Sequence, residues 1–372
     1  MYEELTRRRW PLILIALAIV VAGGWSALWY YAAGRAETVI AGWREREAKV
    51  GRIHTCGSQT VGGFPLRFEM RCADPGLELK SAAQPLSIKA KDILVTAKVW
   101  QPTLLTTEIT GPLTIADPGQ PPTITANWQR ARSEVRGLPT APEQVAMVFD
   151  QLVVERTGGG ASQRMFNAAH LEIGGRMLEG SATSNPVIEL SLKTKSAVAP
   201  TLHQVMEIPL DADITAVLRG LNDFRPKPWP DRFREIQAAG GSIEISNARL
   251  QQGETIAVTN GTLALSPSGR PHGQLRLTIA NLASLLPALG LDGRAAPVNK
   301  PLDNAASRLD RIAPGLGGIA RQNAAPALTA ALNFIGQPAE IDGKRAVTLP
   351  LRFNDGAVTL GPIPLGQTAP LF

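Results

Sequence analysis

WPLILIALAIVVAGGWSALWYYAAG, residues 10–34, is a run of 25 residues without a charged side chain. A helix rises about 1.5 Å per residue, so a helix of this length covers the roughly 30 Å hydrocarbon core of a bilayer. Basic and aromatic residues, which favour membrane interfaces, stand at the two ends: Arg7, Arg8, Arg9 and Trp10 before the run, and Trp25, Trp29, Tyr30 and Tyr31 at its far end. We therefore predict one transmembrane anchor over 10–34.

Two other interpretations of this run stay open. Small residues at Ala32, Ala33 and Gly34 could serve a signal peptidase. A signal core usually has about 7 to 15 apolar residues, however, so we expect the longer run to be retained as an anchor. A buried core helix is the other alternative.

The orientation of the anchor follows from the charges that flank it. The arginine triplet favours a cytoplasmic location for the N-terminal residues 1–9. Basic residues beyond the run, such as Arg35 and Lys49, weaken that argument. Long domains that follow an anchor are translocated largely regardless of charge. We predict a single-pass protein of a bacterial inner membrane, with the bulk of the chain in the periplasm.

The chain has two cysteines, Cys56 and Cys72, which lie just beyond the anchor in a segment that predicts a hairpin. A disulfide that closes a loop of this size contributes about 3 kcal/mol on the chain-entropy model. Such a bond persists in an oxidising compartment, which agrees with export. Two inert buried thiols are an alternative, and so is a metal pair, although no further cysteine or nearby paired histidine supports it.

Composition predicts the fold class. With 19% charged and 44% hydrophobic residues, the chain suits one span and a globular body. The 35 Gly and 29 Pro separate short runs in which apolar residues alternate with Thr, Lys and Ser, as in β-strands. We predict a mainly β protein with a few helices and a long, antiparallel, meandering, curved sheet or half-barrel. The net charge of +6 is spread along the chain, so we expect no nucleic-acid partner.

The body divides by composition into three predicted parts. Residues 35–50 predict an amphipathic helix that either lies on the bilayer or covers a sheet edge, and we favour the sheet edge. Residues 51–225 predict a β region with the disulfide hairpin, and residues 226–372 a β region with helices. Further helices are predicted near Pro142, from Asp231 to Ala239, after Asn281 and within 302–336. We expect hairpin turns at Thr110-Gly111, Asn260-Gly261 and Asp355-Gly356.

The segment GGFPLRF combines a glycine turn with a fixed proline exit. Its motif residues are Gly62, Gly63, Phe64, Pro65, Arg67 and Phe68. An N-terminal span, a helix carrying Gly-Trp, and this motif between two cysteines resemble the DUF2125 family of uncharacterised alphaproteobacterial envelope proteins. That family has no established activity, so the resemblance implies an envelope location and no chemistry.

A second resemblance concerns the C-terminal half. A helix near residue 231, a meander of alternating strands and then Asn281 before a Leu-rich run resemble the C-terminal regions of AsmA-like envelope proteins. These proteins are associated with moving or organising lipids between membranes. The resemblance therefore implies a lipid-related role.

We find no pattern of residues that predicts catalysis or a cofactor. His54, His170, His203 and His272 are scattered without the paired spacing of a zinc site. Asp211 and Asp213 form a D-x-D pair without a third carboxylate or the glycine of a calcium loop. The glycines at 158–160 lack the flanking residues of a phosphate-binding loop. We expect a protein that is not an enzyme and has no catalytic, metal or cofactor site.

The predicted architecture leads to a functional hypothesis. Strands from Leu77 to Val135 and from Ile243 to Ile279 supply an apolar residue at nearly every second position, while few helices are available to cover them. We expect an apolar trough that binds phospholipid or another acyl-chain lipid, with Val95 and Leu263 as candidate positions on it. The alternative is a scaffold of an envelope complex with a self-packed β body.

Overall fold

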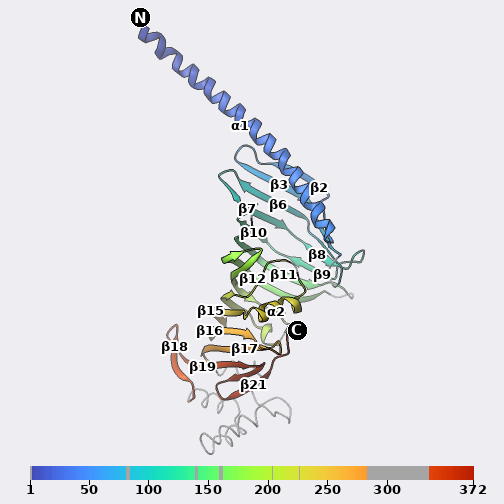
Figure 1. The fold of residues 1–372 in the computed structure, drawn as a ribbon, viewed down its shortest axis with the longest axis vertical. Coiled ribbons are helices and arrows are strands. Elements are labelled where there is room, and N and C mark those ends of the chain that lie inside the picture. Colours follow the sequence, from blue (N-terminus) through green and yellow to red (C-terminus); the bar gives the residue numbers. More distant parts are fainter. Residues whose placement is uncertain are drawn as a thin grey trace, which may run out of the picture. The chain divides into compact units, whose positions relative to one another are not determined.

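The computed structural model describes residues 2–80, 84–138, 141–158, 162–202, 204–225, 227–282 and 335–372. This part of the chain is mainly antiparallel β-structure with two α-helices, which confirms the predicted fold class (Figure 1). It divides into two compact units, Met1–Pro139 with Val154–Gln163, and Thr140–Val153 with Arg164–Phe372. The boundary expected at 225/226 therefore falls inside the second unit. The helices predicted after Asn281 and within 302–336 fall mostly on residues 283–334, outside this description.

Helix α1 (Tyr2–Lys49) is continuous, so the predicted anchor and the predicted juxtamembrane helix form one element. The two predicted segments join because no proline occurs from Leu12 to Val50 to end the helix. Residues from Trp10 onward are long and apolar enough for this helix to cross a membrane. The helix ends at Lys49, and Gly51 follows it with a positive φ of 80°, which suits a glycine after a helix C-terminus.

The last turns of α1 pack against the first strands. The Trp43 ring lies 4.5 Å from the His54 ring between centroids, and Arg44 donates a 2.7 Å hydrogen bond to Gln59. Arg52 donates to Glu47. This end of α1 therefore lies beside the edge of the sheet in the first unit, as we expected for residues 35–50.

Five long strands, each bent near its middle, form the described sheet of the first unit. The successive halves are β1 (Arg52–Thr55) and β2 (Ser58–Gly62), β3 (Arg67–Ala73) and β4 (Gly76–Leu79), β5 (Leu86–Lys89) and β6 (Asp92–Lys98), β7 (Gln101–Thr110) and β8 (Leu113–Ala116), and β9 (Ile124–Asn127) and β10 (Arg130–Arg136). On one side of the bend the ladder runs β2-β3-β6-β7-β10, and on the other β1-β4-β5-β8-β9. The chain is thus an antiparallel meander that bends along one line.

Glycine or proline marks this bend in three of the five strands, because both residues interrupt a regular ladder. Pro75 separates β3 from β4, and Gly111-Pro112 separates β7 from β8. The Trp128 ring lies 3.5 Å from where a Cβ on Gly111 would stand, and Trp128 Nε1 donates a 2.8 Å hydrogen bond to the Ile109 carbonyl. The turn predicted at Thr110-Gly111 is therefore a bend inside one strand, because β8 pairs with β5 and β9 and not with β7.

The second unit contains its own series of antiparallel strands. They are β12 (Gln163–Ser181), β13 (Ser184–Ala197), β14 (Leu210–Leu218), β15 (Ser242–Gln252), β16 (Thr255–Leu265), β17 (Pro271–Ala280), β19 (Lys344–Asn354), β20 (Ala357–Leu360) and β21 (Ile363–Gln367), each paired with the next. Strand β18 (Gln337–Ile341) pairs with the start of β19, and a 3-10 turn, η1 (Gln204–Glu207), precedes β14.

Two predictions for this unit were wrong. The helix expected near Pro142 is instead strand β11 (Gln144–Arg156), because its many β-branched and aromatic residues favour a strand. The Asn260-Gly261 turn lies inside β16, where a Cβ on Gly261 would stand 2.4 Å from the Gln274 carbonyl oxygen. This glycine permits close approach of β17. The predicted turn at Asp355-Gly356, by contrast, is confirmed between β19 and β20.

The packed core of the second unit lies among β17, β19, β20 and β21. Its fully buried members are Ile279, Leu282, Val347, Leu349, Leu360 and Ile363. In the first unit, by contrast, Trp29 is the one large apolar side chain that is buried among the described residues. The two units therefore differ in how completely their apolar faces are covered.

Cys56 and Cys72 form a disulfide with an Sγ–Sγ distance of 2.06 Å, as the sequence predicted. The bond joins the first strand at its bend to the neighbouring strand β3.

We expect the double variant Cys56→Ser/Cys72→Ser to lose about 3 kcal/mol of unfolding free energy on the chain-entropy model. Denaturant unfolding measures this loss. In protein taken from its native membrane, thiol alkylation without reductant should label neither residue, and two freely alkylated cysteines would contradict an oxidising location.

Candidate functional site: an apolar cavity beneath helix α2

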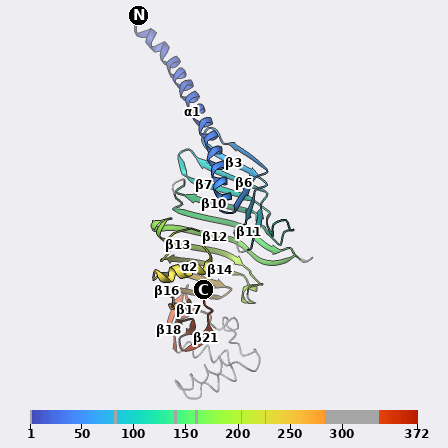
Figure 2. The same ribbon diagram turned by 45° about the vertical axis from the view of Figure 1, so that its right-hand side comes forward.

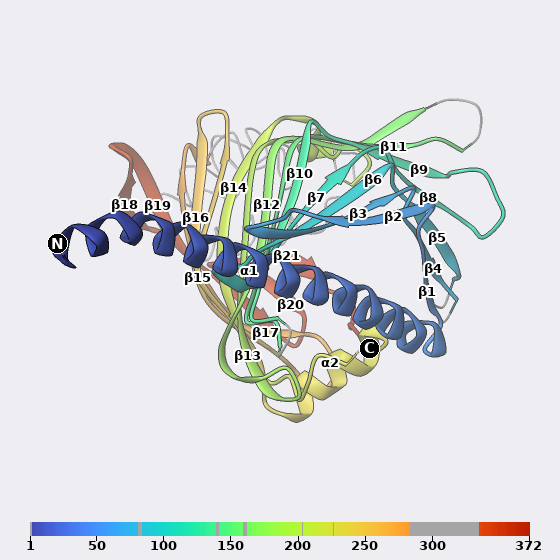
Figure 3. The same cartoon turned by 90° about the horizontal axis from the view of Figure 1, so that it is seen from above.

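An apolar cavity of ≈ 610 Å³ lies in the second unit between α2 (Trp229–Ala238) and strands β13 to β17. Strand pairing builds its floor, because Ile188 lies opposite Leu218, Leu218 opposite Ile243, and Ile243 opposite Leu263. Residues directly opposite in antiparallel strands project from the same face of the sheet. The floor is therefore one continuous apolar row, and α2 lies against the same strands (Figures 2 and 3).

Helix α2 covers this floor with its apolar side. Trp229, Phe233 and Ile236 line the cavity at helical spacing, and the first two rings stack at 5.9 Å. The helix ends close to the sheet because Gly241 donates a 2.7 Å hydrogen bond to the Ile236 carbonyl. A Cβ on Gly241 would stand 2.4 Å from the Arg219 carbonyl oxygen, so a larger residue would push the helix away from the strands.

The cavity opens to solvent through apolar side chains. Trp229 is 73% exposed, although it lines the cavity together with the buried Ile236. Other partly exposed lining residues are Leu190, Phe224 and Leu371. Apolar side chains at the mouth of an apolar cavity give a hydrophobic ligand a continuous path from the surface to the floor.

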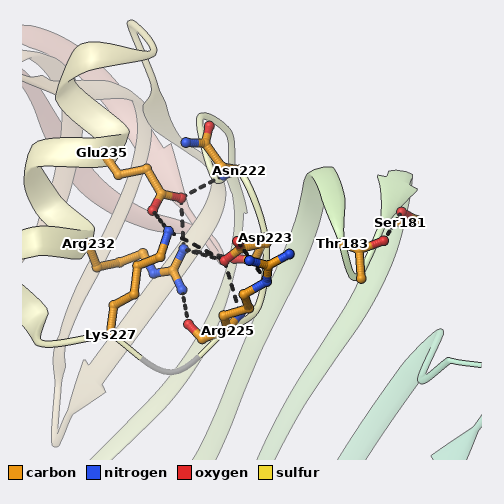
Figure 4. A network of polar contacts seen from close by, with 8 residues as sticks. All are labelled: Ser181, Thr183, Asn222, Asp223, Arg225, Lys227, Arg232 and Glu235. Carbon is orange, nitrogen blue, oxygen red and sulfur yellow. Dashed lines mark hydrogen bonds and ion pairs between the residues drawn. The ribbon is translucent and has the colours of Figure 1, made fainter.

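A charged network forms the rim (Figure 4). Arg232 on α2 donates 2.7 Å and 2.8 Å hydrogen bonds to the Glu235 carboxylate and the Asp223 carbonyl. Lys227 forms ion pairs with both carboxylates, at 3.5 Å to Asp223. The Arg225 guanidinium lies 3.5 Å from Asp223 and is 76% exposed. Three cations and two carboxylates leave one positive charge (3 − 2 = +1), carried at the surface by Arg225.

The network also fixes the ionisation of its carboxylates. Burial opposes the charged form of Glu235, but hydrogen bonds from Lys227, the Asn222 N–H and Arg232 lower its pKa below the ordinary value of 4.5. Burial likewise opposes the charge on Asp223, and the Arg225 N–H and Lys227 lower its pKa below 3.8. Both side chains are therefore anionic at neutral pH, and through their cations they hold α2 to the loop around Asn222 and Asp223 that precedes it.

These shifts predict acid sensitivity of the second unit. A carboxyl whose pKa is lower in the folded than in the unfolded protein stabilises the fold at pH values above its unfolded pKa. This contribution is lost as the pH falls through the folded pKa. We expect the unfolding free energy to fall below about pH 4, where the unfolded carboxyls begin to bind protons. Denaturant titrations from neutral to acid pH measure this loss. Glu235→Gln should flatten the dependence, and an unchanged profile would contradict the role of the network.

The apolar face of the first unit is only partly covered. Paired positions on β3, β6 and β7 form cross-strand rows, such as Met70–Val95–Thr107 and Phe68–Ala97–Leu105. These apolar side chains are half-buried, and Trp29 of α1 stacks on Phe68 at one edge of the face. Val95, a predicted trough position, therefore lies on an incompletely covered face, whereas Leu263 lies on the floor of the cavity in the second unit.

The predicted motif residues lie where α1 meets the β2–β3 turn, beside Trp25, Trp29 and Tyr30 of the predicted interface. Gly63 has a φ of 96°, and a Cβ there would stand 2.6 Å from the Arg67 carbonyl oxygen, so glycine is required. Trp25 and Trp29 donate their indole N–H groups to the Pro65 and Arg67 carbonyls at 3.0 Å and 3.2 Å. Arg7, Arg8 and Arg9 lie in α1, before the residues whose side chains are described.

Of the residues considered for metal binding, His170, Asp211 and Asp213 line one pocket, but His170 and Asp211 have other polar partners. His170 contacts Asp150 at 2.8 Å, His54 packs on Trp43, and Asp211 accepts the Ser196 N–H at 2.7 Å. Among the described residues, no three His, Cys, Asp or Glu side chains gather as a metal site would require. His203 lies outside the described residues. The expectation that the chain is not an enzyme stays a prediction.

The sequence predicted an apolar trough with Leu263 on it, but it did not reveal that α2 covers this floor or that a charged network forms the rim. The signal for the rim was the proline-rich segment RPKPWPD, residues 225–231, whose two cations and one aspartate stand between a strand and an amphipathic helix. Which strand residues lie beneath that helix depends on the register of β13 to β16, and the sequence alone does not determine the register.

An apolar N-terminal helix and a mainly antiparallel β body with a hydrophobic cavity define a class of protein suited to attachment at a membrane. The model of one family, DUF2125, described as an uncharacterized protein conserved in bacteria, matches residues 29–369. The chain belongs to this family, which confirms the first resemblance. No curated protein matches the chain.

Proposed function

We propose that the protein is anchored in a bacterial inner membrane by α1 and binds an acyl chain of a lipid in the cavity beneath α2, with its body in the periplasm. The cavity carries this proposal. Its volume of ≈ 610 Å³ lies within the roughly 300–1,000 Å³ range of small-molecule sites. Each methylene that leaves water for such an apolar cavity contributes about 0.8 kcal/mol.

The charges at the mouth suit an amphiphile. An acyl chain on the row from Ile188 to Leu263 would place its polar end at the rim, where Arg225 is exposed. An anionic phosphate or carboxylate there gains a charge-assisted hydrogen bond from a guanidinium. The disulfide supports an oxidising compartment. The AsmA-like resemblance of this half of the chain agrees with a lipid-related role and stays a prediction.

Photo-crosslinking in native membranes tests this function. A photoreactive residue at Leu263, on the cavity floor, should capture lipid. The same residue at Leu202, which is 77% exposed and outside the cavity, serves as the control. Equal capture at both positions, or none at Leu263, would overturn lipid binding in this cavity and favour a scaffold with a self-packed body.

A further inference from the structure

Two adjacent turns of the first unit expose large apolar side chains beside α1. In the β2–β3 turn Phe64 is 46% and Leu66 is 56% exposed, and in the β6–β7 turn Trp100 is 62% exposed. Strand pairing brings the turns together, because Arg67 lies opposite Lys98 and the Val99 N–H donates a 3.1 Å hydrogen bond to the Leu66 carbonyl. Both turns lie at the same end of the ladder (Figure 1).

Aromatic contacts fix the β2–β3 turn to α1. The Trp29 ring stacks on Phe68 at 5.3 Å and meets Phe64 edge-on at 5.6 Å, and Tyr30 stacks on Phe64 at 5.9 Å. The Trp25 indole donates to Pro65. The turn is therefore held beside residues 25–30 of α1.

Residues 25–30 of α1 lie at the expected edge of the hydrocarbon core. If the core begins at Trp10, about 20 residues of helix span its roughly 30 Å and end at about Tyr30. Tryptophan and tyrosine favour this boundary because their rings are apolar and their N–H or O–H groups are polar. Here the indole N–H groups of Trp25 and Trp29 are already bonded to backbone carbonyls of the turn.

The geometry points to a second membrane contact: the Phe64–Leu66 turn and Trp100 insert into the lipid interface next to α1. This inference rests on the membrane anchoring in the proposed function, and it is independent of lipid binding in the cavity. Basic side chains accompany the inserted groups, since Lys98 lies 5.9 Å from the Trp100 ring and Arg67 is exposed beside the turn. Such cations are attracted to anionic headgroups.

A bilayer fits this surface better than a protein partner because the surface is continuous with α1. Partly inserted aromatic side chains and a helix that leaves the same membrane would restrain the first unit at two points. A single flexible tether would leave the body free to rotate. The motif GGFP thus gains a role: it shapes a turn that packs on the helix and presents Phe64 and Leu66 to lipid.

Spin-label accessibility tests this contact in the full chain, reconstituted in phosphatidylcholine–phosphatidylglycerol vesicles. Single labels are attached through Leu66→Cys or Trp100→Cys, because the native cysteines are joined in a disulfide and do not react. Gln120→Cys in an exposed turn of the same unit provides the aqueous control, and Val20→Cys in the predicted span provides the lipid control.

We expect labels at 66 and 100 to resemble the label at 20, with greater accessibility to oxygen than to a water-soluble nickel complex, whereas the label at 120 shows the reverse. Aqueous behaviour at 66 and 100 with a lipid-exposed label at 20 would overturn the inference alone. An aqueous label at 20 would overturn the membrane anchoring as well.

A second measurement uses Trp100→Phe, a conservative substitution that leaves the turn nearly unchanged. Brominated lipid should quench part of the tryptophan emission of the wild-type chain, and Trp100→Phe should lose a measurable share of that quenching. If the emission lost to quenching per protein chain is equal in both chains, Trp100 lies outside the bilayer and the inference is contradicted.

Discussion

Replacing Leu263 by tryptophan should remove bound lipid from the protein while the fold persists. Leu263 stands at the end of the apolar row that forms the cavity floor, and its side chain faces open space beneath α2. A larger indole occupies that space without displacing packed atoms, so overpacking strain stays small. Every methylene of a ligand that the indole excludes costs about 0.8 kcal/mol, and exclusion of about four weakens binding by about 3 kcal/mol, more than a hundredfold.

Lipid extraction from the purified chain, followed by mass spectrometry, measures this loss as the ratio of lipid to protein. Ile173→Trp is the matched control, because Ile173 is an apolar residue in the same unit that is 47% exposed and does not line the cavity. We expect the control to retain wild-type lipid. If both variants retain lipid equally, the lipid lies elsewhere, for example around α1.

Removing the Arg232 side chain should give the largest loss of stability among the rim residues. This guanidinium is 12% exposed and contacts Glu235, which is 7% exposed, together with two backbone carbonyls. Its loss leaves buried carboxylates and carbonyls with fewer partners. We expect Arg232→Ala to lower the unfolding free energy by about 2 kcal/mol, since a truncated buried partner leaves the other charge uncompensated.

Arg234→Ala provides the control on the same helix. Arg234 pairs with Asp231 at 2.7 Å, but both side chains are 56% exposed. Exposed pairs contribute little, so we expect a loss of about 0.5 kcal/mol. Denaturant unfolding monitored through the second unit measures both variants. Equal losses would show that the rim network does not hold α2 to the loop around Asn222 and Asp223.

Local patterns predicted much of this fold. Alternation marked nearly every strand between residues 86 and 136, and the apolar run identified the long N-terminal helix, because both signals depend only on neighbouring residues. The helix from Asp231 also required only its local pattern. The Cys56–Cys72 bond was predicted because the chain has no other cysteine.

The failures arose where tertiary contacts override local signals. Asn260-Gly261 has the composition of a hairpin turn, yet its glycine serves the close approach of β17. The bend at Gly111-Pro112 divides a long strand, whereas the sequence suggested a hairpin turn at Thr110-Gly111. The sequence predicted an apolar trough but not the cavity beneath α2, because Ile188, Leu218 and Ile243 come together only through the register of strands far apart in sequence.

Native mass spectrometry of the full chain, released from detergent micelles in the gas phase, tests lipid binding most directly. Loosely associated lipid around α1 is stripped with the micelle, whereas an acyl chain enclosed between α2 and the strands is retained. We predict a wild-type species heavier than the polypeptide by one lipid, and a Leu263→Trp species at the bare polypeptide mass. A bare wild-type chain, or the same lipid adducts on both chains, would contradict binding in the cavity.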